Sequence, residues 1–501
     1  MIRVPKVNAL FDFSRCRYST LSTVGLPTIY ALSTPPGQRS AIAVVRISGS
    51  HSKYIYHKLT KSKNDPKPRI ASLRKLYSSV DKKGVLDSSL TLFFSSPNTF
   101  TGEDILELHL HGGKAVTSCV LKAIEELHDL GSGYNIRYAY PGEFSKRAFQ
   151  NAKFDLTEIE GIRDLIDAET ETQRKSALSS FNGENRDRFM QWRTKIISNV
   201  AQLTAIIDFG DDTEIQDIEK IVMTVESNIK QLRNEIREFI KKIERSSILR
   251  SGIRTVLLGP PNAGKSSLIN TISKDDISIV SQTPGTTRDA IEVAINVNGY
   301  KVIICDTAGI RDGSSDEIEV LGIEKAMKKS SQCDLCLLLV DPQNESPIPD
   351  RLKQHLSSPQ LLNTDTVLVL NKMDIFENSL EAKKYIDQLK RETNSRFPII
   401  PISCLSGIGI NQLVDELTTK FQAMSNSSDE SDPIIVSQRV KEILNNDVLY
   451  GIEEFLSLKD DVVLASESLR HATDGIGKIT GETIGIEEVL GVVFSSFCVG
   501  K

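Results

Sequence analysis

The spacing of apolar positions changes period along the chain, and each change marks a predicted domain. Early in the chain, "SAIAVVRISG", "SSLTLFF" and "DILELHLHGG" contain the short apolar runs typical of β-strands. From Thr157 onward the apolar positions recur every three or four residues, which is the period of a helix. We therefore predict a mixed α/β domain over residues 28–150, followed by the first part of a helical domain over residues 151–252.

A longer helical pattern lies further along this second region. Seven apolar residues alternate three and four positions apart, which suits either a coiled-coil seam or a helix bundle: Val222, Val225, Ile229, Leu232, Ile236, Phe239 and Ile243. We favour the bundle, because it requires only that these side chains bury against a neighbouring helix.

Residues 253–423 return to strands that alternate with helices. The Asn298-Gly299 pair in "INVNGYKVIICD" predicts a tight hairpin. "DLCLLLVD" and "DTVLVLNKMD" are continuous apolar strands, as a parallel sheet covered on both faces requires. Helical patterning resumes over residues 424–501, after the acidic linker "SNSSDESDP". The simplest reconstruction is one helical domain into which the α/β block is inserted.

Composition narrows the class of protein. The chain has 501 residues and a net charge of −5, so three domains are expected and no global basic field attracts nucleic acid. Its seven cysteines are scattered, which favours a reducing compartment, and Cys333 and Cys336 run into an apolar strand rather than a metal motif. Residues 1–27 are basic and rich in hydroxyl groups, which predicts a mitochondrial transit peptide, a disordered basic N-terminus being the alternative.

The candidate chemistry lies in the α/β block. "GPPNAGKS" matches the phosphate-binding loop G-x-x-x-x-G-K-[ST], in which backbone amides and Lys265 face the phosphates and Ser266 binds Mg²⁺. This motif alone leaves ATP and GTP open. "DTAG" then supplies a carboxylate near Mg²⁺, and "NKMD" supplies Asp374, which can accept two hydrogen bonds from guanine but none from adenine. Together they predict a Ras-like GTPase domain.

The last base-contacting loop, "SCL", departs from the usual Ser-Ala-Lys, which weakens that contact. The predicted GTP contacts are Asn262, Ala263, Gly264, Lys265, Ser266, Ser267, Ser281, Gln282, Thr283, Pro284, Gly285, Thr286, Thr287, Asp306, Thr307, Ala308, Gly309, Asn371, Lys372, Met373, Asp374, Ser403 and Cys404.

The segments that follow the phosphate-binding loop and "DTAG" would contact the γ-phosphate, and they lack one residue expected for hydrolysis. Thr287 in "SQTPGTTRD" is the natural threonine to close on Mg²⁺ and the γ-phosphate. Ras-like enzymes follow D-x-x-G with a glutamine that positions water, whereas this chain has Ile310, which cannot. Either another residue does so, and Glu319 in "DEIE" is the candidate, or the protein is a slow switch.

The chain as a whole resembles the MnmE (TrmE) family of tRNA modification GTPases in their mitochondrial form. The resemblance rests on "VVRISG", "FTGEDILELHLHGG", "PGEFSKRAFQNAKFDL", "GPPNAGKSS", "TPGTTRD", "DTAGIR" and the terminal "FCVGK". It implies an N-terminal folate-binding domain that dimerises, a helical domain and an inserted G domain with a mixed, mostly parallel sheet. It also implies modification of the wobble uridine of mitochondrial tRNAs at the 5-position, with tetrahydrofolate as cofactor, a FAD-dependent partner of the MnmG type and a mitochondrial matrix location.

The resemblance also implies roles for individual residues. Folate contacts are carried over to Arg46, Glu107, Lys153 and Lys501, and a nucleophilic role to Cys498, which competes with a simple buried thiol. Glu107, His109 and His111 share one strand face, and a metal site there is a weaker alternative. The implied K⁺ ligands are Asn262, Ser281, Thr283 and Thr286, and K⁺ with Glu319 would replace the missing glutamine.

A GTPase switch in mitochondrial ribosome assembly or translation is the rival hypothesis. Such proteins of the Era type carry a KH module with a G-x-x-G loop after the G domain. The glycines of "DGIGKITGETIG" never stand three apart, which favours tRNA modification. A C-terminal lipid anchor is disfavoured by the last two residues, Gly500 and Lys501.

Overall fold

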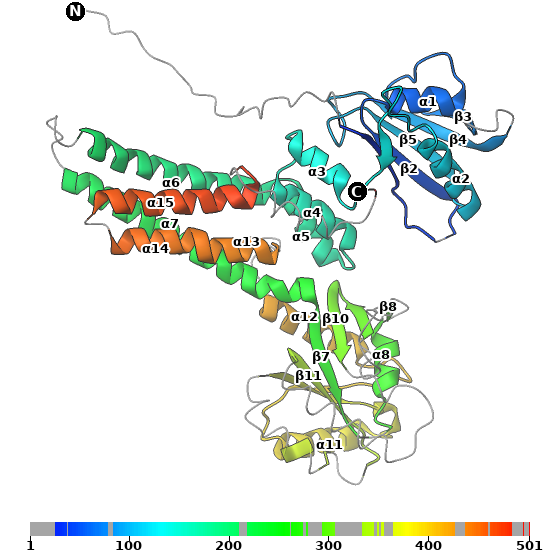
Figure 1. The fold of residues 1–501 in the computed structure, drawn as a ribbon. Coiled ribbons are helices and arrows are strands. Elements are labelled where there is room, and N and C mark those ends of the chain that lie inside the picture. Colours follow the sequence, from blue (N-terminus) through cyan, green and yellow to red (C-terminus); the bar gives the residue numbers. More distant parts are fainter. Residues whose placement is uncertain are drawn as a thin grey trace, which may run out of the picture. The chain divides into compact units, whose positions relative to one another are not determined.

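A computed structural model describes most of the chain. The described residues are 26–37, 39–78, 84–209, 218–260, 262–273, 277–278, 293–305, 333–344, 348–349, 352–354, 364–425, 436–458, 461–482, 494 and 500. They belong to two compact units: Met1–Asp155 with Ile484–Lys501, and Leu156–Thr483. Figure 1 shows the elements of each unit. Within the described ranges, no helix is both long enough and apolar enough to cross a membrane.

The first unit is a mixed α/β domain built on a six-stranded sheet in the order β3-β4-β5-β2-β1-β6. Neighbouring strands are antiparallel except for β1 and β6, which are parallel. The elements are β1 (Thr28–Leu32), β2 (Ile42–Ser48), α1 (Ser52–Thr60), β3 (Ser72–Tyr77), β4 (Val85–Phe94), β5 (Ile105–His111), α2 (Lys114–Glu125), β6 (Ile136–Tyr138) and α3 (Glu143–Gln150). The three strands predicted from apolar runs are β2, β4 and β5.

Helices α1 and α2 share one hydrophobic core with the sheet. Ile55 and Leu59 of α1 and Val120 and Ile124 of α2 are almost fully buried in a cluster with strand residues such as Leu108. Burial of each such side chain contributes about 1.5–3 kcal/mol. This core leaves the alternate strand residues, Glu107 among them, on the opposite face of the sheet.

Helix α3 is tied to the sheet by a buried ionic network. The Arg147 guanidinium donates to both Glu103 carboxylate oxygens at 3.1 and 3.0 Å and to Glu143 Oε1 at 3.1 Å. Arg137 forms a bidentate pair with Glu143 at 2.8 and 2.6 Å. Burial raises the pKa of the Glu143 carboxyl, but the hydrogen bonds from Arg137 and the Tyr140 amide and the charges of both arginines outweigh it, so its pKa lies below the ordinary value.

The second unit contains the helical domain. Its helices are α4 (Leu156–Asp167), α5 (Glu171–Phe181), α6 (Glu184–Phe209), α7 (Ile218–Ser251), α13 (Gln438–Ile443), the π-helical turn η3 (Leu444–Leu449), α14 (Tyr450–Ser457) and α15 (Val462–Thr480). One hydrophobic core joins residues of α6 and α7 to residues of α13, η3, α14 and α15. Since these two sets flank the α/β block in sequence, the predicted insertion is confirmed.

The bundle interpretation of α7 is also confirmed. Six of the seven residues on its apolar stripe are buried in the shared core, and Val222, at the start, is half-buried. Helix α7 then leads directly into the first strand of the G domain, with Gly252 between them.

The G domain has a seven-stranded sheet in the order β13-β12-β11-β7-β10-β9-β8. The five strands from β13 to β10 are parallel, whereas β9 and β8 are antiparallel. The elements are β7 (Ile253–Leu258), α8 (Lys265–Ser273), β8 (Ile277–Ser278), β9 (Val293–Val297), β10 (Tyr300–Cys305), β11 (Leu335–Val340), β12 (Asp365–Leu370), η2 (Met373–Ile375), α11 (Ser379–Glu392), β13 (Ile399–Pro401) and α12 (Ile410–Ser425). The predicted mixed, mostly parallel sheet and the Asn298-Gly299 hairpin are thus observed.

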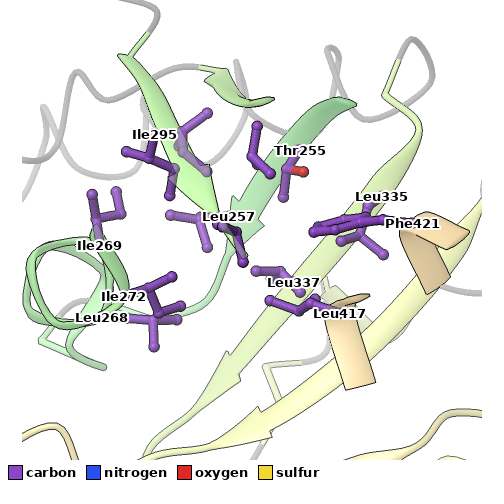
Figure 2. Close-up of a pocket in the computed structure, with 13 residues that line it drawn as sticks. Thr255, Leu257, Leu268, Ile269, Ile272, Ile295, Leu335, Leu337, Leu417 and Phe421 are labelled. Carbon is purple, nitrogen blue, oxygen red and sulfur yellow. The ribbon is translucent and has the colours of Figure 1, made fainter. Parts of the chain in front are cut away.

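Helices α8 and α12 pack on this sheet through apolar side chains. Figure 2 shows Leu268, Ile269 and Ile272 of α8 lying against strand residues that include Leu257 and Ile295. Among the described residues that line this cavity, Thr255 is the one with a polar side chain. The cavity is therefore part of the packing that fixes the start of α8, where the phosphate-binding loop ends.

Candidate functional site

The predicted nucleotide motifs each follow a strand of the G-domain sheet in the sequence. The phosphate-binding loop follows β7, "DTAG" follows β10, "NKMD" follows β12, and "SCL" follows β13. These strands run parallel, so their carboxyl ends lie at the same edge. Ligands of open α/β sheets bind at this edge, in the crevice beyond the strand ends.

The phosphate-binding loop has backbone conformations that favour its residue types. Asn262 is left-handed, with φ of 58°, which asparagine tolerates better than most residues. Gly264 has φ of 92°, and a β-carbon there would collide with the Asn371 side chain. A larger residue at position 264 would therefore disrupt both the loop and its neighbour.

The Lys265 side chain is hydrogen-bonded to the backbone of the phosphate-binding loop. Its ammonium group donates to the carbonyl oxygens of Gly259 and Pro260 at 3.0 and 2.9 Å. The charge is thus located beside the backbone turn that precedes α8, whose N-terminus also favours anions. Ser266 and Ser267 occupy the first turn of that helix, as the motif predicts.

Asn371 connects the phosphate-binding loop to the base-recognition motifs. Its Nδ2 donates to the Ala263 carbonyl oxygen at 2.9 Å, and its Oδ1 accepts from the Cys404 amide at 3.2 Å. Its own amide donates to the Val340 carbonyl oxygen at 3.0 Å. The side chain is buried, so these bonds are shielded from water.

Asp374 is oriented by the "SCL" loop. The Ser403 hydroxyl donates to Asp374 Oδ1, and the Ser406 amide donates to the Ser403 hydroxyl oxygen at 3.1 Å. The contact of Cys404 with Asn371 uses its backbone amide. The departure from Ser-Ala-Lys therefore leaves the backbone contact in place.

Asp341 is a site residue that the motif search missed. It follows β11, is buried, and accepts from the Lys372 ammonium group at 2.6 Å. This ion pair fixes Lys372, whose backbone is left-handed with φ of 61°. The available signal was positional, because Asp341 directly follows an apolar strand in "DLCLLLVD", as Asn371 does in "DTVLVLNKMD".

Fourteen of the predicted site residues lie outside the described parts of the chain: Ser281, Gln282, Thr283, Pro284, Gly285, Thr286, Thr287, Asp306, Thr307, Ala308, Gly309, Glu319, Cys498 and Lys501. Their roles stay predictions, as do the transit peptide and the role of Ile310.

Cys333 and Cys336 have the surroundings of structural thiols. Burial raises the pKa of Cys333 to about 11, and it raises the pKa of Cys336, which lies within the fully buried strand β11. Both thiols are therefore protonated near neutral pH and are poor nucleophiles and poor metal ligands.

In the first unit, two predicted folate residues form a cross-strand pair. Arg46 of β2 lies opposite Glu107 of β5, and Arg46 Nε donates to Glu107 Oε1 at 3.0 Å. The Arg46 guanidinium also lies over the Phe100 ring, 5.7 Å from its centroid. Both charged side chains are partly buried, which strengthens their interaction relative to an exposed pair.

Lys153 lies beside the loop that carries Phe100. Its Cε atom is 3.2 Å from the position that a β-carbon on Gly102 would occupy. Phe154 contacts Phe100, with ring centroids 5.6 Å apart. The fold thus brings Arg46, Glu107 and Lys153 around residues 100–102, although they are far apart in sequence.

The histidines on the same strand do not form a metal site with Glu107. His111 Nδ1 pairs with Asp87 at 2.7 Å, whereas His109 Nε2 lies 3.5 Å from Glu107 Oε2. Over the described ranges, no three His, Cys, Asp or Glu side chains are grouped so as to hold a metal ion. The alternative of a metal triad at this strand is therefore wrong.

Gly500, near the end of the chain, contacts the first strand of the first unit. The Ser33 hydroxyl donates to the Gly500 carbonyl oxygen at 3.1 Å. Gly500 has φ of 95°, and a β-carbon there would collide with the Leu32 carbonyl oxygen. Since Leu32 pairs with Val45, next to Arg46, Gly500 lies near the strand pair that carries two of the predicted folate residues.

Comparison with known proteins gives matches over almost the whole chain. Residues 28–153 match the family model of the GTP-binding protein TrmE N-terminus, and residues 156–498 match that of the MnmE helical domain. The mitochondrial tRNA modification GTPase MSS1 of Saccharomyces cerevisiae is 56% identical over 97% of this chain and 96% of its own length.

More distant relatives align over the same span. The tRNA modification GTPase MnmE of a Wolbachia endosymbiont of Brugia malayi is 38% identical over 95% of this chain and 99% of its own. The mitochondrial 5-taurinomethyluridine-[tRNA] synthase subunit GTPB3 of Danio rerio is 37% identical over 95% of this chain and 94% of its own.

Proposed function

The chain belongs to the MnmE (TrmE) family of tRNA modification GTPases, and from this premise we propose its reaction. It is a GTP hydrolase that acts in tRNA modification in mitochondria. With a FAD-dependent partner of the MnmG type, in the mitochondrial matrix, it installs a carboxymethylaminomethyl-type group at the 5-position of the wobble uridine.

One observation supports GTP as the nucleotide above all others. Asn371 hydrogen-bonds Ala263 of the phosphate-binding loop and Cys404 of the base-contacting loop, and Ser403 orients Asp374. The phosphate and base ends of the site are thus held in one arrangement. A fixed carboxylate at Asp374 rejects adenine, because adenine offers it no donor pair.

The predicted ligand groups of the phosphate-binding loop and of the segment "SQTPGTTRD" suit Mg²⁺ and K⁺. Ser266 and Thr287 would hold Mg²⁺, and Asn262 with Ser281, Thr283 and Thr286 would hold K⁺. All offer oxygen atoms, which hard cations prefer. When bound, the cations supply positive charge against the charge that develops on the γ-phosphate. Glu319 would position the attacking water, a role that Ile310 cannot fill.

The folate cofactor fits the Arg46–Glu107 region in its chemistry. A carboxylate can hold a pterin edge, and cations such as Arg46, Lys153 and Lys501 can pair with the glutamate tail. Phe100 adds an aromatic surface next to Arg46.

Two further roles belong to this proposal. Cys498 would act as a nucleophile from the C-terminal segment. The N-terminal domain would form the homodimer.

The test is GTP turnover in matched K⁺ and Na⁺ buffers, for the wild type, Glu319→Ala and the control Glu381→Ala. Glu381 is an exposed acid on α11. We expect K⁺ to stimulate turnover by the wild type strongly. Glu319→Ala should lose turnover, and Glu381→Ala should keep the wild-type rate. Equal rates in both salts would refute the K⁺ mechanism.

The ribosome-assembly alternative gains no support from the described C-terminal region. Gly475 and Gly477 lie within helix α15, not in a loop. A G-x-x-G loop is therefore absent from residues 461–482. Nucleoside analysis of mitochondrial tRNA from cells that lack the protein separates the two: loss of the wobble modification supports the proposal, and its retention supports the alternative.

A further inference from the structure

The segment from α1 to β3 in the first unit is strongly basic. Between residues 51 and 78 the sequence has eight lysines and arginines and a single acid, Asp65, in a chain whose net charge is −5. All eight are exposed: Lys53, Lys58, Lys61, Lys63, Lys67, Arg69, Arg74 and Lys75. We call this surface the basic segment.

Side-chain contacts join its helix, loop and strand into one surface. Lys53 on α1 lies 3.5 Å from Asp65 in the loop. Arg74 on β3 donates from Nε to the Tyr56 hydroxyl oxygen on α1, at 3.1 Å. The two labelled elements lie side by side (Figure 1). The positive charges are therefore neighbours in space as well as in sequence.

Internal pairing leaves most of this charge unbalanced. The Asp65 carboxylate pairs with His57 at 2.9 Å as well as with Lys53. The hydrogen bond from His57 and the nearby Lys53 hold the pKa of Asp65 below its ordinary value, so it stays ionised. Within residues 51–78 one carboxylate cannot offset eight cations, and mutual repulsion among them is a cost to the folded state.

Protection of a sheet edge does not account for the eight cations of the basic segment. Strand β3 is the edge of the sheet, and lysines on edge strands prevent pairing with other chains. Only Arg74 and Lys75 belong to β3, however, whereas the other six cations lie on α1 and the loop. Charges at those positions have no edge to protect.

We propose that the basic segment binds the phosphodiester backbone of the tRNA substrate. This inference rests on the proposed function, which supplies the RNA. A cluster of exposed cations fits repeated phosphates, and such contacts position a nucleic acid without reading its sequence. The basic segment would thus hold a tRNA to the unit that carries the predicted folate residues.

The aromatic residues nearby favour backbone contact over base stacking. Tyr54 stacks on Tyr134 with ring centroids 3.7 Å apart, and the Lys58 ammonium lies 5.4 Å from the Tyr54 centroid. The Lys61 ammonium lies 3.7 Å from the Tyr77 centroid. These ring faces already contact protein groups, whereas single-strand binders present aromatic faces to the bases.

The test compares two triple variants of the full-length chain in tRNA binding. The test variant replaces Lys63, Lys67 and Lys75 by Gln. The matched control replaces three exposed lysines of α11 by Gln, namely Lys383, Lys384 and Lys390. Both lose the same net charge, and neither touches the nucleotide site. GTP turnover without tRNA and the circular dichroism spectrum check that both variants fold.

Binding of an unmodified mitochondrial tRNA is measured against salt concentration. We expect the test variant to bind at least about tenfold more weakly, with a salt slope lower by about two to three, and the control to match the wild type. Equal Kd values and slopes for the two variants would overturn the inference while leaving the proposed function intact. No tRNA binding by the wild type, either alone or with its FAD-dependent partner, would overturn both.

A parallel measurement uses phosphatidylcholine vesicles with and without phosphatidylserine. If the test variant loses binding to the anionic vesicles and keeps wild-type tRNA binding, the surface serves a membrane and the inference is wrong. Loss of tRNA binding alone supports it. Salt-dependent tRNA binding that is unchanged in both variants would assign RNA contact to another surface.

Discussion

Replacement of Asn371 by alanine should weaken GTP binding although the lost side chain carries no charge. Its side chain is buried and makes two hydrogen bonds, one to the Ala263 carbonyl oxygen and one from the Cys404 amide. The alanine variant loses both bonds and leaves the buried Ala263 carbonyl without this donor. The phosphate-binding loop then loses its connection to the base-recognition motifs.

The expected magnitude follows from those two bonds. A net hydrogen bond contributes about 1 kcal/mol, and an unpaired buried polar group costs about 1–3 kcal/mol. We therefore expect the assembled site to lose about 2–3 kcal/mol relative to other loop arrangements. Apparent affinity falls with the population of the competent arrangement. At 1.4 kcal/mol per decade, the Kd for GTP should rise roughly 30- to 140-fold.

The assay is titration of the Mg²⁺-loaded protein with a fluorescent GTP analogue. Asn371→Asp provides a second variant, because it keeps the acceptor for the Cys404 amide but cannot donate to the Ala263 carbonyl. Asn445→Ala provides the control, since its Nδ2 makes a single exposed bond to the Lys441 carbonyl oxygen. We expect wild-type affinity in the control and weak binding in both Asn371 variants.

A Kd for Asn371→Ala within about threefold of the wild type would refute the reasoning, because two buried bonds cannot be lost at so small a cost. Weak binding in Asn445→Ala would refute it equally, since the effect would then not depend on the site.

Three further predictions address other parts of the chain. Gly500→Ala should release the C-terminal segment and speed removal of the last residue by a carboxypeptidase, whereas Gly37→Ala, also at positive φ but with open space around it, should not. Glu143 has a lowered pKa in the fold, so its ionised form stabilises the protein above the unfolded pKa of about 4.3. That stabilisation is lost as pH falls through the folded pKa. In urea unfolding, the loss caused by Glu143→Gln should thus be larger near pH 7 than near about pH 3, and a constant loss would contradict this. An alkylating reagent at neutral pH should modify the exposed Cys119 well before Cys336, and equal rates would show that burial does not suppress the second thiol.

Local patterns in the sequence determined most of the architecture. The hairpin at Asn298-Gly299, the apolar strands β11 and β12 and the buried stripe of α7 all follow from side-chain period and turn chemistry. The phosphate-binding loop was equally readable, because its glycines and lysine act within eight consecutive residues, Gly259 to Ser266. Such features depend on neighbours in the chain, so the sequence alone is enough to predict them.

The tertiary structure alone decided which distant residues meet. Register between β2 and β5 sets Arg46 against Glu107. The pairing of β4 with β5 brings His111 to Asp87. Asn371 reaches Ala263 across 108 positions, and Gly500 reaches Ser33 across 467. Apolar period reports which face of an element is buried but not what covers it, because partners are set by strand order and chain crossing. The same holds for the basic segment. Its charges can be counted in the sequence, but only the packing of α1 beside β3 makes them one surface.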